Sequence, residues 1–164
     1  MMDERAFQTI YRQTAVPLRR YAARVMGSVA RADDVVQETY LRLLRQSPST
    51  EDPREIRAWL FRIASNLIID HWRRHKHEAP ASEAAERQSH DPDAALRIDM
   101  ARTFQRLRPQ ERQLMWLAHV EGASHREIAA TLGLSEGSIR VLLSRARRKL
   151  ADLLRAGGHG PGAR

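Results

Sequence analysis

Residues 124–149 read SHREIAATLGLSEGSIRVLLSRARRK and predict a helix-turn-helix. Ser124, followed three residues later by Glu127, is a capping box that opens a short helix at His125. Gly133 ends this helix where a left-handed residue is expected, and Ser135 stands at the cap position of the next helix. A short helix, a tight turn with glycine and then a longer helix is the spacing of this motif.

The longer helix, predicted over residues 136–155, has two distinct faces. At ~100° per residue, its apolar side chains fall within about 100° of arc. These are Ile139, Leu142, Leu143, Ala146, Leu150 and Leu153. The opposite face carries Arg140, Val141, Ser144, Arg145, Arg147 and Arg148. An ordinary amphipathic surface helix, the alternative interpretation, usually interleaves Glu with its basic residues. Because residues 138–149 include five basic residues and no acid, DNA recognition is favoured.

The composition agrees with a nucleic-acid partner. The chain has 164 residues and a net charge of +8, and 26 of its 28 basic residues are Arg, whose forked donors suit phosphates and guanine edges. The absence of cysteine excludes disulfides, zinc ribbons and cysteine nucleophiles. Because no apolar run approaches ~18 residues and the N-terminus does not resemble a signal peptide, we expect a soluble, cytoplasmic protein without membrane insertion.

The charge is divided along the chain, and this division predicts the domains. Residues 1–76 carry a net charge of +5, residues 77–95 carry −4, and residues 96–164 carry +7. Glycine and proline are sparse within the basic parts, and no segment alternates apolar with polar residues. We therefore predict an all-α fold with two small helical domains. Apolar residues make up 42% of the chain but aromatic residues only 5%, a mix that fits two small cores better than one large one. The predicted units are a domain at 1–76, a flexible acidic linker at 77–95, a helix-turn-helix domain at 96–156, and a disordered tail at 157–164.

Local signals place the helices within these units. In the N-terminal domain, a helix is predicted over 3–27, bent near Pro17, and a second over 32–46. Asp33 and Asp34 would lie in the first turn of the second helix, where they complement its dipole. Asp52 and Pro53 open a third helix that runs to about His75. In the C-terminal domain, helices are predicted over residues 96–107, 110–121, 125–132 and 136–155.

Three further stretches carry a resemblance to a known family. Residues 33–44 read DDVVQETYLRLL, residues 58–74 read AWLFRIASNLIIDHWRR, and residues 107–112 read LRPQER. With the helix-turn-helix, they resemble in order the polymerase-binding motif, the −10 element segment and the −35 domain of bacterial sigma factors. The sequence of residues 127–137 also resembles a segment of response-regulator output domains, so the C-terminal half alone is not specific. Both halves in this order make the resemblance specific. From Phe7 to Leu154 the chain resembles an extracytoplasmic-function (ECF) sigma factor, the minimal two-domain class.

The resemblance implies a polymerase-binding site. Asp34, Gln37, Glu38 and Leu41 fall where the family binds the coiled coil of the polymerase β′ subunit. An acidic and apolar helix face suits a basic partner helix. Capping of the helix dipole is the alternative role for Asp33 and Asp34, and both roles can hold together.

The resemblance also implies a site for the non-template strand of the −10 element. Its residues are Arg62, Asn66, Asp70, Arg73 and Arg74, with the loop at 47–52. Asn and Asp can read a base edge, while arginines position phosphates. Alternatively, Asn66 and Asp70 satisfy local backbone groups. Trp59 and Trp72 could stack on unpaired bases; we expect burial for Trp59 and leave Trp72 open. The chain lacks the richer aromatic cluster of primary sigma factors, which implies weaker DNA melting.

In the −35 domain, the family's base-contacting positions correspond to Arg140, Val141, Ser144 and Arg145. The two arginines could donate in pairs to guanine, and Val141 could meet a thymine methyl group. Some relatives have a larger residue in place of Ser144, so its contacts differ here. The predicted −35 site is completed by Ser124, Ser138, Arg147 and Arg148.

No other chemistry is predicted. His71, His75 and His77 have no acid or cysteine to complete a metal site, so we predict neither a metal nor a cofactor. No nucleophile with a base and no phosphate-binding glycine loop appears, so we do not predict an enzyme. The expected partners are core RNA polymerase, promoter DNA and an anti-sigma factor. Two alternatives remain: a free-standing helix-turn-helix regulator with an N-terminal dimerisation or sensing domain, and a helical adaptor that binds no DNA.

Overall fold

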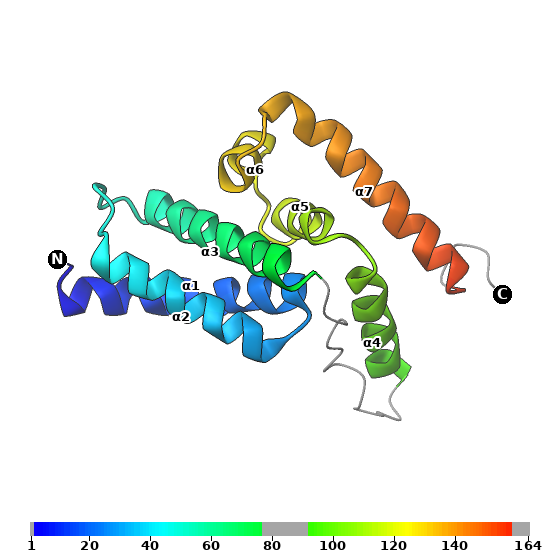
Figure 1. Cartoon of the computed structure of the whole chain (residues 1–164), viewed down its shortest axis with the longest axis horizontal. Helices are drawn as coiled ribbons and strands as arrows, with labels where there is room; N and C mark the ends of the chain where they lie inside the picture. The colour runs from blue at the N-terminus through cyan, green and yellow to red at the C-terminus, as the bar shows by residue number, and fades with distance from the viewer. Residues whose placement is uncertain (1, 77–91, 159–164) are drawn as a thin grey trace.

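The computed structural model describes residues 2–76 and 92–158, and within these ranges it is all-helical (Figure 1). The first group of helices is α1 (Glu4–Met26), α2 (Val29–Arg45) and α3 (Pro53–His75). The second group is α4 (Pro92–Gln105), α5 (Pro109–His119), α6 (His125–Leu132) and α7 (Glu136–Ala156). We call α1–α3 the N-lobe and α4–α7 the C-lobe. The prediction of an all-α fold is confirmed.

The helix ends in the N-lobe are set by local capping. The Asp3 carboxylate accepts a hydrogen bond from the Ala6 amide at 2.8 Å and so begins α1, which continues through Pro17. Gly27, with φ of +69°, ends this helix in the left-handed conformation. The Asp52 carboxylate accepts from the Arg54 amide at 2.9 Å at the start of α3, as the sequence predicts.

The structure corrects the predicted start of α2. This helix begins at Val29 rather than near residue 32, because the Ser28 side chain accepts a hydrogen bond from the Arg31 amide at 3.3 Å. The first turn therefore contains no acid. The prediction that Asp33 and Asp34 complement the dipole from the first turn is wrong, since both lie farther along the helix.

Other boundaries also differ from the prediction. Residues 92–95, predicted as linker, are the first turn of α4, with Pro92 at its start and Asp93 near its positive end. Helix α5 starts at Pro109 and ends at His119, not at Glu121. Ser135 takes the cap position of α7, but its side chain makes no capping hydrogen bond. The linker at 77–91 and the tail beyond residue 158 lie outside the described residues.

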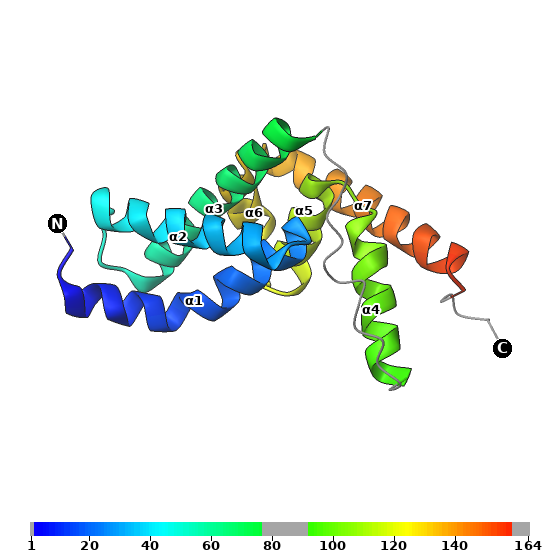
Figure 2. The ribbon, with the colours of Figure 1, turned by 60° about the horizontal axis from the view of Figure 1, so that its bottom comes forward.

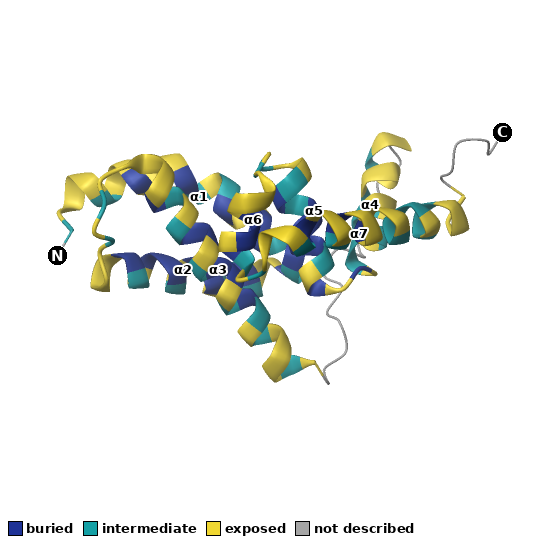
Figure 3. Cartoon of the chain, turned by 90° about the horizontal axis from the view of Figure 1, so that it is seen from above, coloured by how far each residue is buried: buried dark blue, intermediate teal, exposed yellow. Residues whose placement is uncertain are grey.

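The two lobes share one continuous core, whereas the composition favoured two small ones. The buried apolar side chains of α1–α3, α5, α6 and α7 form a single cluster. Helix α3 packs against α6, and α1 packs against α5. Figure 3 shows buried residues gathered where these helices meet. The N-lobe and C-lobe are therefore docked on each other.

Helix α4 differs from the rest because none of its residues is fully buried. Its N-terminal half extends away from the other helices (Figure 2), and Leu96 and Met100 remain exposed there. Its C-terminal end is fixed by Arg112 of α5, whose Nη1 donates to the carbonyls of Gln105 at 2.8 Å and Leu107 at 3.1 Å. Burial lowers the pKa of this guanidinium to about 10, so it stays cationic at neutral pH.

No helix in the described ranges is long and apolar enough to cross a membrane.

Candidate DNA-binding and protein-binding surfaces

The helix-turn-helix of α6 and α7 is held by the predicted capping box. The Ser124 hydroxyl accepts from the Glu127 amide at 3.1 Å, and the Glu127 carboxylate accepts from the Ser124 amide at 2.9 Å. The backbone hydrogen bond from Ser124, followed by the side-chain one, lowers the pKa of Glu127. Gly133 has φ of +67° and turns the chain into α7. The predicted motif therefore forms, and the Ser124 hydroxyl is engaged as a cap.

The two predicted faces of α7 are confirmed by burial. Ile139, Leu143 and Ala146 are buried against the other C-lobe helices. The side chains of the opposite face are all exposed: Arg140, Val141, Ser144, Arg145, Arg147 and Arg148. Val141 is a large apolar residue with 49% of its surface exposed. We call this set of six residues the α7 basic face.

Contacts at the edge of this face distinguish its cations. Lys149 Nζ lies 3.0 Å from Glu111 Oε1, so the positive charge of Lys149 is balanced by α5. Arg147 Nε donates to His119 Nε2 at 3.1 Å, so the imidazole at the end of α5 holds it in place. Within the described residues, no ion pair is formed by Arg140, Arg145 or Arg148. Ser138 is half-buried, and its hydroxyl donates to the Ser135 carbonyl at 2.8 Å, which gives it a role in starting α7.

A second surface lies on α2. Asp34, Gln37 and Leu41 are exposed, and Glu38 is half-buried. Their spacing places them along one side of the helix. Glu38 Oε1 accepts from Arg42 Nε at 3.1 Å, so one of the two acids is paired. This side is thus acidic and apolar, as the sequence predicts.

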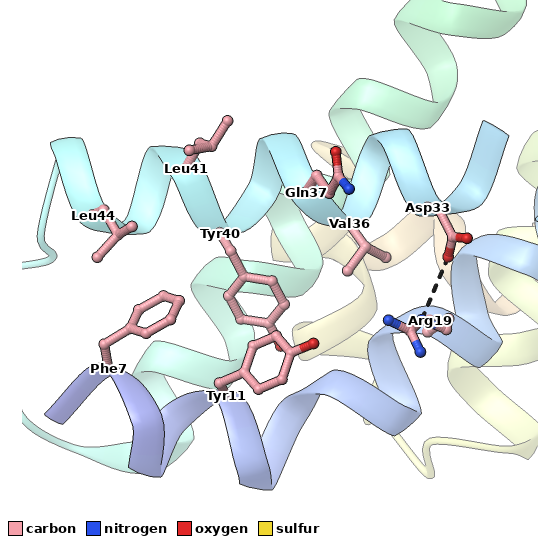
Figure 4. Close-up of a pocket in the computed structure, with 9 residues that line it drawn as sticks. All are labelled: Phe7, Tyr11, Arg19, Asp33, Val36, Gln37, Tyr40, Leu41 and Leu44. Carbon is pink, nitrogen blue, oxygen red and sulfur yellow. Dashed lines mark ion pairs between the residues drawn. The ribbon is translucent and has the colours of Figure 1, made fainter. Parts of the chain in front are cut away.

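Sequence reasoning missed a groove beside this surface (Figure 4). The groove has a volume of about 400 Å³ and runs between α1 and α2. It is lined by Phe7, Tyr11, Arg19, Asp33, Val36, Gln37, Tyr40, Leu41 and Leu44. The Tyr11 and Tyr40 rings lie 5.0 Å apart, and an Arg19–Asp33 ion pair of 3.4 Å closes one end. The groove is lined by Gln37 and Leu41 from α2 and by the aromatic rings of Phe7 and Tyr11 from α1. The only sequence signal for these rings was the four-residue, helical spacing of Phe7 and Tyr11.

The third surface follows the exposed side of α3. It consists of Arg62, Asn66, Asp70, Arg73 and Arg74, which are all exposed. Arg74 Nε donates to the backbone carbonyl of Asp70 at 3.3 Å and not to its carboxylate. Within the described part of the chain, the side chains of Asn66 and Asp70 form no hydrogen bond to a local backbone group. The structure therefore does not support the alternative reading of these two residues.

The aromatic and histidine residues of α3 follow the prediction in part. Trp59 is half-buried and packs against the core, as expected, while Trp72 is 46% exposed. The rings of His71 and His75 stack with centroids 4.3 Å apart. His77 lies outside the described residues. Among those described, no three His, Cys, Asp or Glu residues gather where they could hold a metal ion.

The chain matches two family models in order. Residues 10–78 match Sigma-70 region 2, and residues 97–150 match Sigma-70 region 4. The chain is 31% identical to the RNA polymerase sigma factor CarQ of Myxococcus xanthus, covering 91% of this chain and 89% of CarQ. It is 34% identical to the ECF RNA polymerase sigma factor SigL of Mycobacterium tuberculosis, covering 87% of this chain and 85% of SigL. The ECF RNA polymerase sigma factor SigE of Mycolicibacterium smegmatis is 33% identical, but the chain spans only 62% of its length.

Solved structures show the same fold. The sigma factor RpoE of Bartonella quintana, in complex with the anti-sigma factor NepR, superposes with a TM-score of 0.71 at 26% identity, covering 91% of this chain and 96% of RpoE. CnrH, in complex with the cytosolic domain of CnrY, superposes with a TM-score of 0.69 at 32% identity. That match covers 94% of this chain and 90% of CnrH.

Proposed function

The chain belongs to the ECF sigma factors of the sigma-70 family, which direct RNA polymerase to promoters, and we propose how its three surfaces divide that task. The N-lobe binds core polymerase and the −10 element, and the C-lobe binds the −35 element. The observation that carries this division is the α7 basic face, since it is exposed, contains no acid and belongs to a helix-turn-helix.

The α2 surface is the proposed contact with core polymerase. Asp34, Gln37, Glu38 and Leu41 would bind the coiled coil of the β′ subunit. Support comes from an exposed and a half-buried acid beside an exposed leucine, an arrangement that complements a basic and partly apolar helix. The adjoining groove offers further apolar area to the same partner.

The α3 surface is the proposed site for the non-template strand of the −10 element. Asn66 and Asp70 have free polar groups that could read base edges, and Arg62, Arg73 and Arg74 surround them with phosphate donors. The exposed ring of Trp72 at the same end of α3 is available to stack on an unpaired base.

The α7 basic face is the proposed reader of the −35 element in the major groove. Arg140 and Arg145 would donate to guanine, and exposed Val141 would contact a thymine methyl group. Arg147 and Arg148 would contact phosphates. Ser124 and Ser138 lie at the starts of α6 and α7 and would come near the DNA backbone there. The Ser124 hydroxyl accepts from the Glu127 amide and keeps its own hydrogen to donate to a phosphate, while Ser138 would act by holding the start of α7.

The remaining roles follow from the same proposal. The N-lobe ends near residue 76 and the C-lobe begins with α4 at Pro92, and the acidic linker between them passes through basic channels of the polymerase. Catalysis belongs to the polymerase, so this chain needs no cofactor, and it acts in the cytoplasm. An anti-sigma factor restrains it, a proposal supported by the two similar sigma factors that were solved with NepR and with CnrY.

Transcription in vitro tests this function. Purified chain and core polymerase are incubated with genomic fragments, and transcript start sites are mapped. The proposal predicts initiation at a set of related sequences only when the chain is present. A free-standing regulator would leave core polymerase without specific starts, and that outcome would contradict the proposal.

A further inference from the structure

The end of α5 holds one cation of the α7 basic face. Arg147 Nε donates to Nε2 of His119 at 3.1 Å, although His119 lies 28 positions earlier in the chain. Among the described residues, Arg147 is the only member of this face whose side chain is hydrogen-bonded to another helix. Both side chains are exposed, so the contact lies on the surface and not in the core.

The backbone that carries His119 is fixed on both sides. His119 is the last residue of α5, and Leu117, in the same turn, is buried. The amide of Val120 donates to the carbonyl of Trp116 at 2.9 Å. The amide of Ala123 donates to the carbonyl of Leu117, also at 2.9 Å. The imidazole therefore projects from a rigid position, and Arg147 is held by a fixed neighbour.

The contact leaves Arg147 able to bind a phosphate. His119 uses the N–H on Nε of the guanidinium, while the N–H groups on both Nη atoms remain. A pair of these can donate to a phosphate as a fork. An imidazole carries no negative charge, so the positive charge of Arg147 is not cancelled by its holder.

Lys149, two residues later on α7, shows the opposite arrangement. Its Nζ lies 3.0 Å from Glu111 Oε1 at the start of α5, so a carboxylate balances its charge. Glu111 is itself held by the capping box of α5, where its side chain accepts from the Arg108 amide at 3.3 Å. Helix α5 thus contacts two cations of α7, one through an anion and one through an imidazole.

These two contacts also fix the rotation of α7. At ~100° per residue, Arg147 and Lys149 project on either side of Ala146, which is fully buried. One is bound to the last residue of α5 and the other to its first turn. Rotation of α7 about its axis in either direction would therefore lengthen one of the contacts. Rotation matters because it decides which side chains of the α7 basic face point toward DNA.

We propose that His119 is a positioning residue for DNA binding: it holds the Arg147 guanidinium ready for a backbone phosphate while leaving its charge uncancelled. The phosphate contact rests on the proposed function of the α7 basic face. An arginine side chain loses conformational entropy when it binds, and holding it beforehand removes part of that loss.

Substitutions of His119 separate holding from charge. His119→Ala removes the acceptor, whereas His119→Gln keeps one, because the side-chain oxygen of glutamine can accept from Arg147 Nε. His119→Glu keeps an acceptor and adds a negative charge, as Glu111 does for Lys149. Gln110→Ala, at an exposed polar position on the same helix, is the matched control. Circular dichroism checks that each variant folds.

Holoenzyme binding to a promoter found by transcription mapping is measured at several salt concentrations. His119→Ala should bind about two- to tenfold more weakly with an unchanged salt slope, because Arg147 is still present but no longer held. His119→Gln and the control should bind like the wild-type chain. His119→Glu should bind more weakly and also lose about one unit of salt slope, as Arg147→Ala does.

A double-mutant cycle adds a readout that a purely structural role of His119 would not change. In an Arg147→Ala background, His119→Ala should have no further effect on promoter binding. In an Arg148→Ala background, His119→Ala should keep its full effect, because Arg148 does not contact the imidazole.

Three results would overturn the role of His119. They are a His119→Ala variant that binds like the wild-type chain although Arg147→Ala binds weakly, a His119→Gln variant as weak as His119→Ala, and a His119→Ala effect that persists in full without Arg147. A His119→Glu variant with an unchanged salt slope would show that the charge of Arg147 is not used.

Failure of the proposed function has a different signature. If Arg147→Ala leaves promoter binding unchanged, Arg147 binds no phosphate and His119 has nothing to position. If no form of the holoenzyme binds the promoter, the proposed function fails as a whole. The nitrogen chemical shift of His119 Nε2 in the free chain then still tests the contact, because an identical shift in the Arg147→Ala variant would overturn it.

Discussion

Glu38 Oε1 lies 3.1 Å from Arg42 Nε, one turn later on α2, so the acidic α2 surface contains an internal ion pair. Both side chains are 39% exposed, and pairs of this kind stabilise a helix only slightly. The pair orients the Glu38 carboxylate toward Arg42, so one acid of the α2 surface already has a partner within the helix.

Reversing the acids should abolish binding to core polymerase. Asp34→Arg with Glu38→Arg replaces the two acids of this surface by cations, which would repel a basic partner helix. Co-purification with core polymerase is expected to be lost while helicity by circular dichroism is retained. Glu4→Arg, at the exposed start of α1, is the control and should bind normally. Normal co-purification of the double variant would remove the basis for placing polymerase on α2.

Substitutions on α3 should separate DNA capture from polymerase binding. Asn66→Ala or Asp70→Ala removes an exposed polar group with no local hydrogen-bond partner, so the fold and core binding should be unchanged. Open-complex formation on a promoter found by transcription mapping is expected to fall. Permanganate reactivity of unpaired thymines measures it, with Gln8→Ala on α1 as control. If a variant unfolds or loses core binding, these residues are structural.

The arginines of the α7 basic face should fall into two classes. Arg140→Ala or Arg145→Ala is expected to cost about 1–3 kcal/mol at promoters with the correct −35 sequence and to relax the preference there. Arg147→Ala or Arg148→Ala should weaken binding at all sequences and flatten its salt dependence, as the loss of a phosphate contact does. Holoenzyme binding to matched promoter variants at several salt concentrations measures both effects. Arg155→Ala, beyond this face, is the control. Equal effects of all four substitutions on every sequence would contradict the assignment.

The capping box of α6 should make stability depend on pH in the acid range. The pKa of Glu127 is lower in the folded chain than its ordinary value of 4.5. Its carboxylate therefore stabilises the fold above that value, and the stabilisation is lost as pH falls through the folded pKa. Ser124→Ala removes the hydroxyl acceptor and is expected to cost about 1 kcal/mol at neutral pH.

Urea unfolding between neutral pH and about pH 3 measures this dependence. The Ser124→Ala variant should lose less stability on acidification than the wild-type chain, because Glu127 then has a more ordinary pKa. Ser144→Ala, at an exposed position on α7, is the control. Parallel pH profiles for Ser124→Ala and the wild-type chain would show that the capping box does not set the pKa of Glu127.

Features set by neighbouring residues could be predicted from the sequence. The predicted caps at Asp52 and Ser124 each accept a hydrogen bond from a backbone amide two or three residues away, so spacing alone identifies them. The two faces of α7 follow from helical periodicity. The start of α2 was missed, although Ser28 is a local signal, because the two aspartates offered a more obvious helix start.

Features that join distant residues could not be predicted. The hydrogen bond from Gln113 to Ser65 spans 48 positions, and nothing local to either residue indicates it. The same holds for His119 and Arg147, 28 positions apart, and for the groove between α1 and α2. These depend on how helices pack, which periodicity does not determine. The docking of the lobes is the largest such feature, since the composition of the chain favoured two separate cores.

Footprinting with and without core polymerase tests the central claim most directly. On a promoter found by transcription mapping, the free chain should protect little DNA, and the holoenzyme should protect an asymmetric region that includes the −10 and −35 elements. Arg140→Ala should remove protection at the −35 element first. A free chain that protects a symmetric operator, with no change on adding core polymerase, would contradict the account.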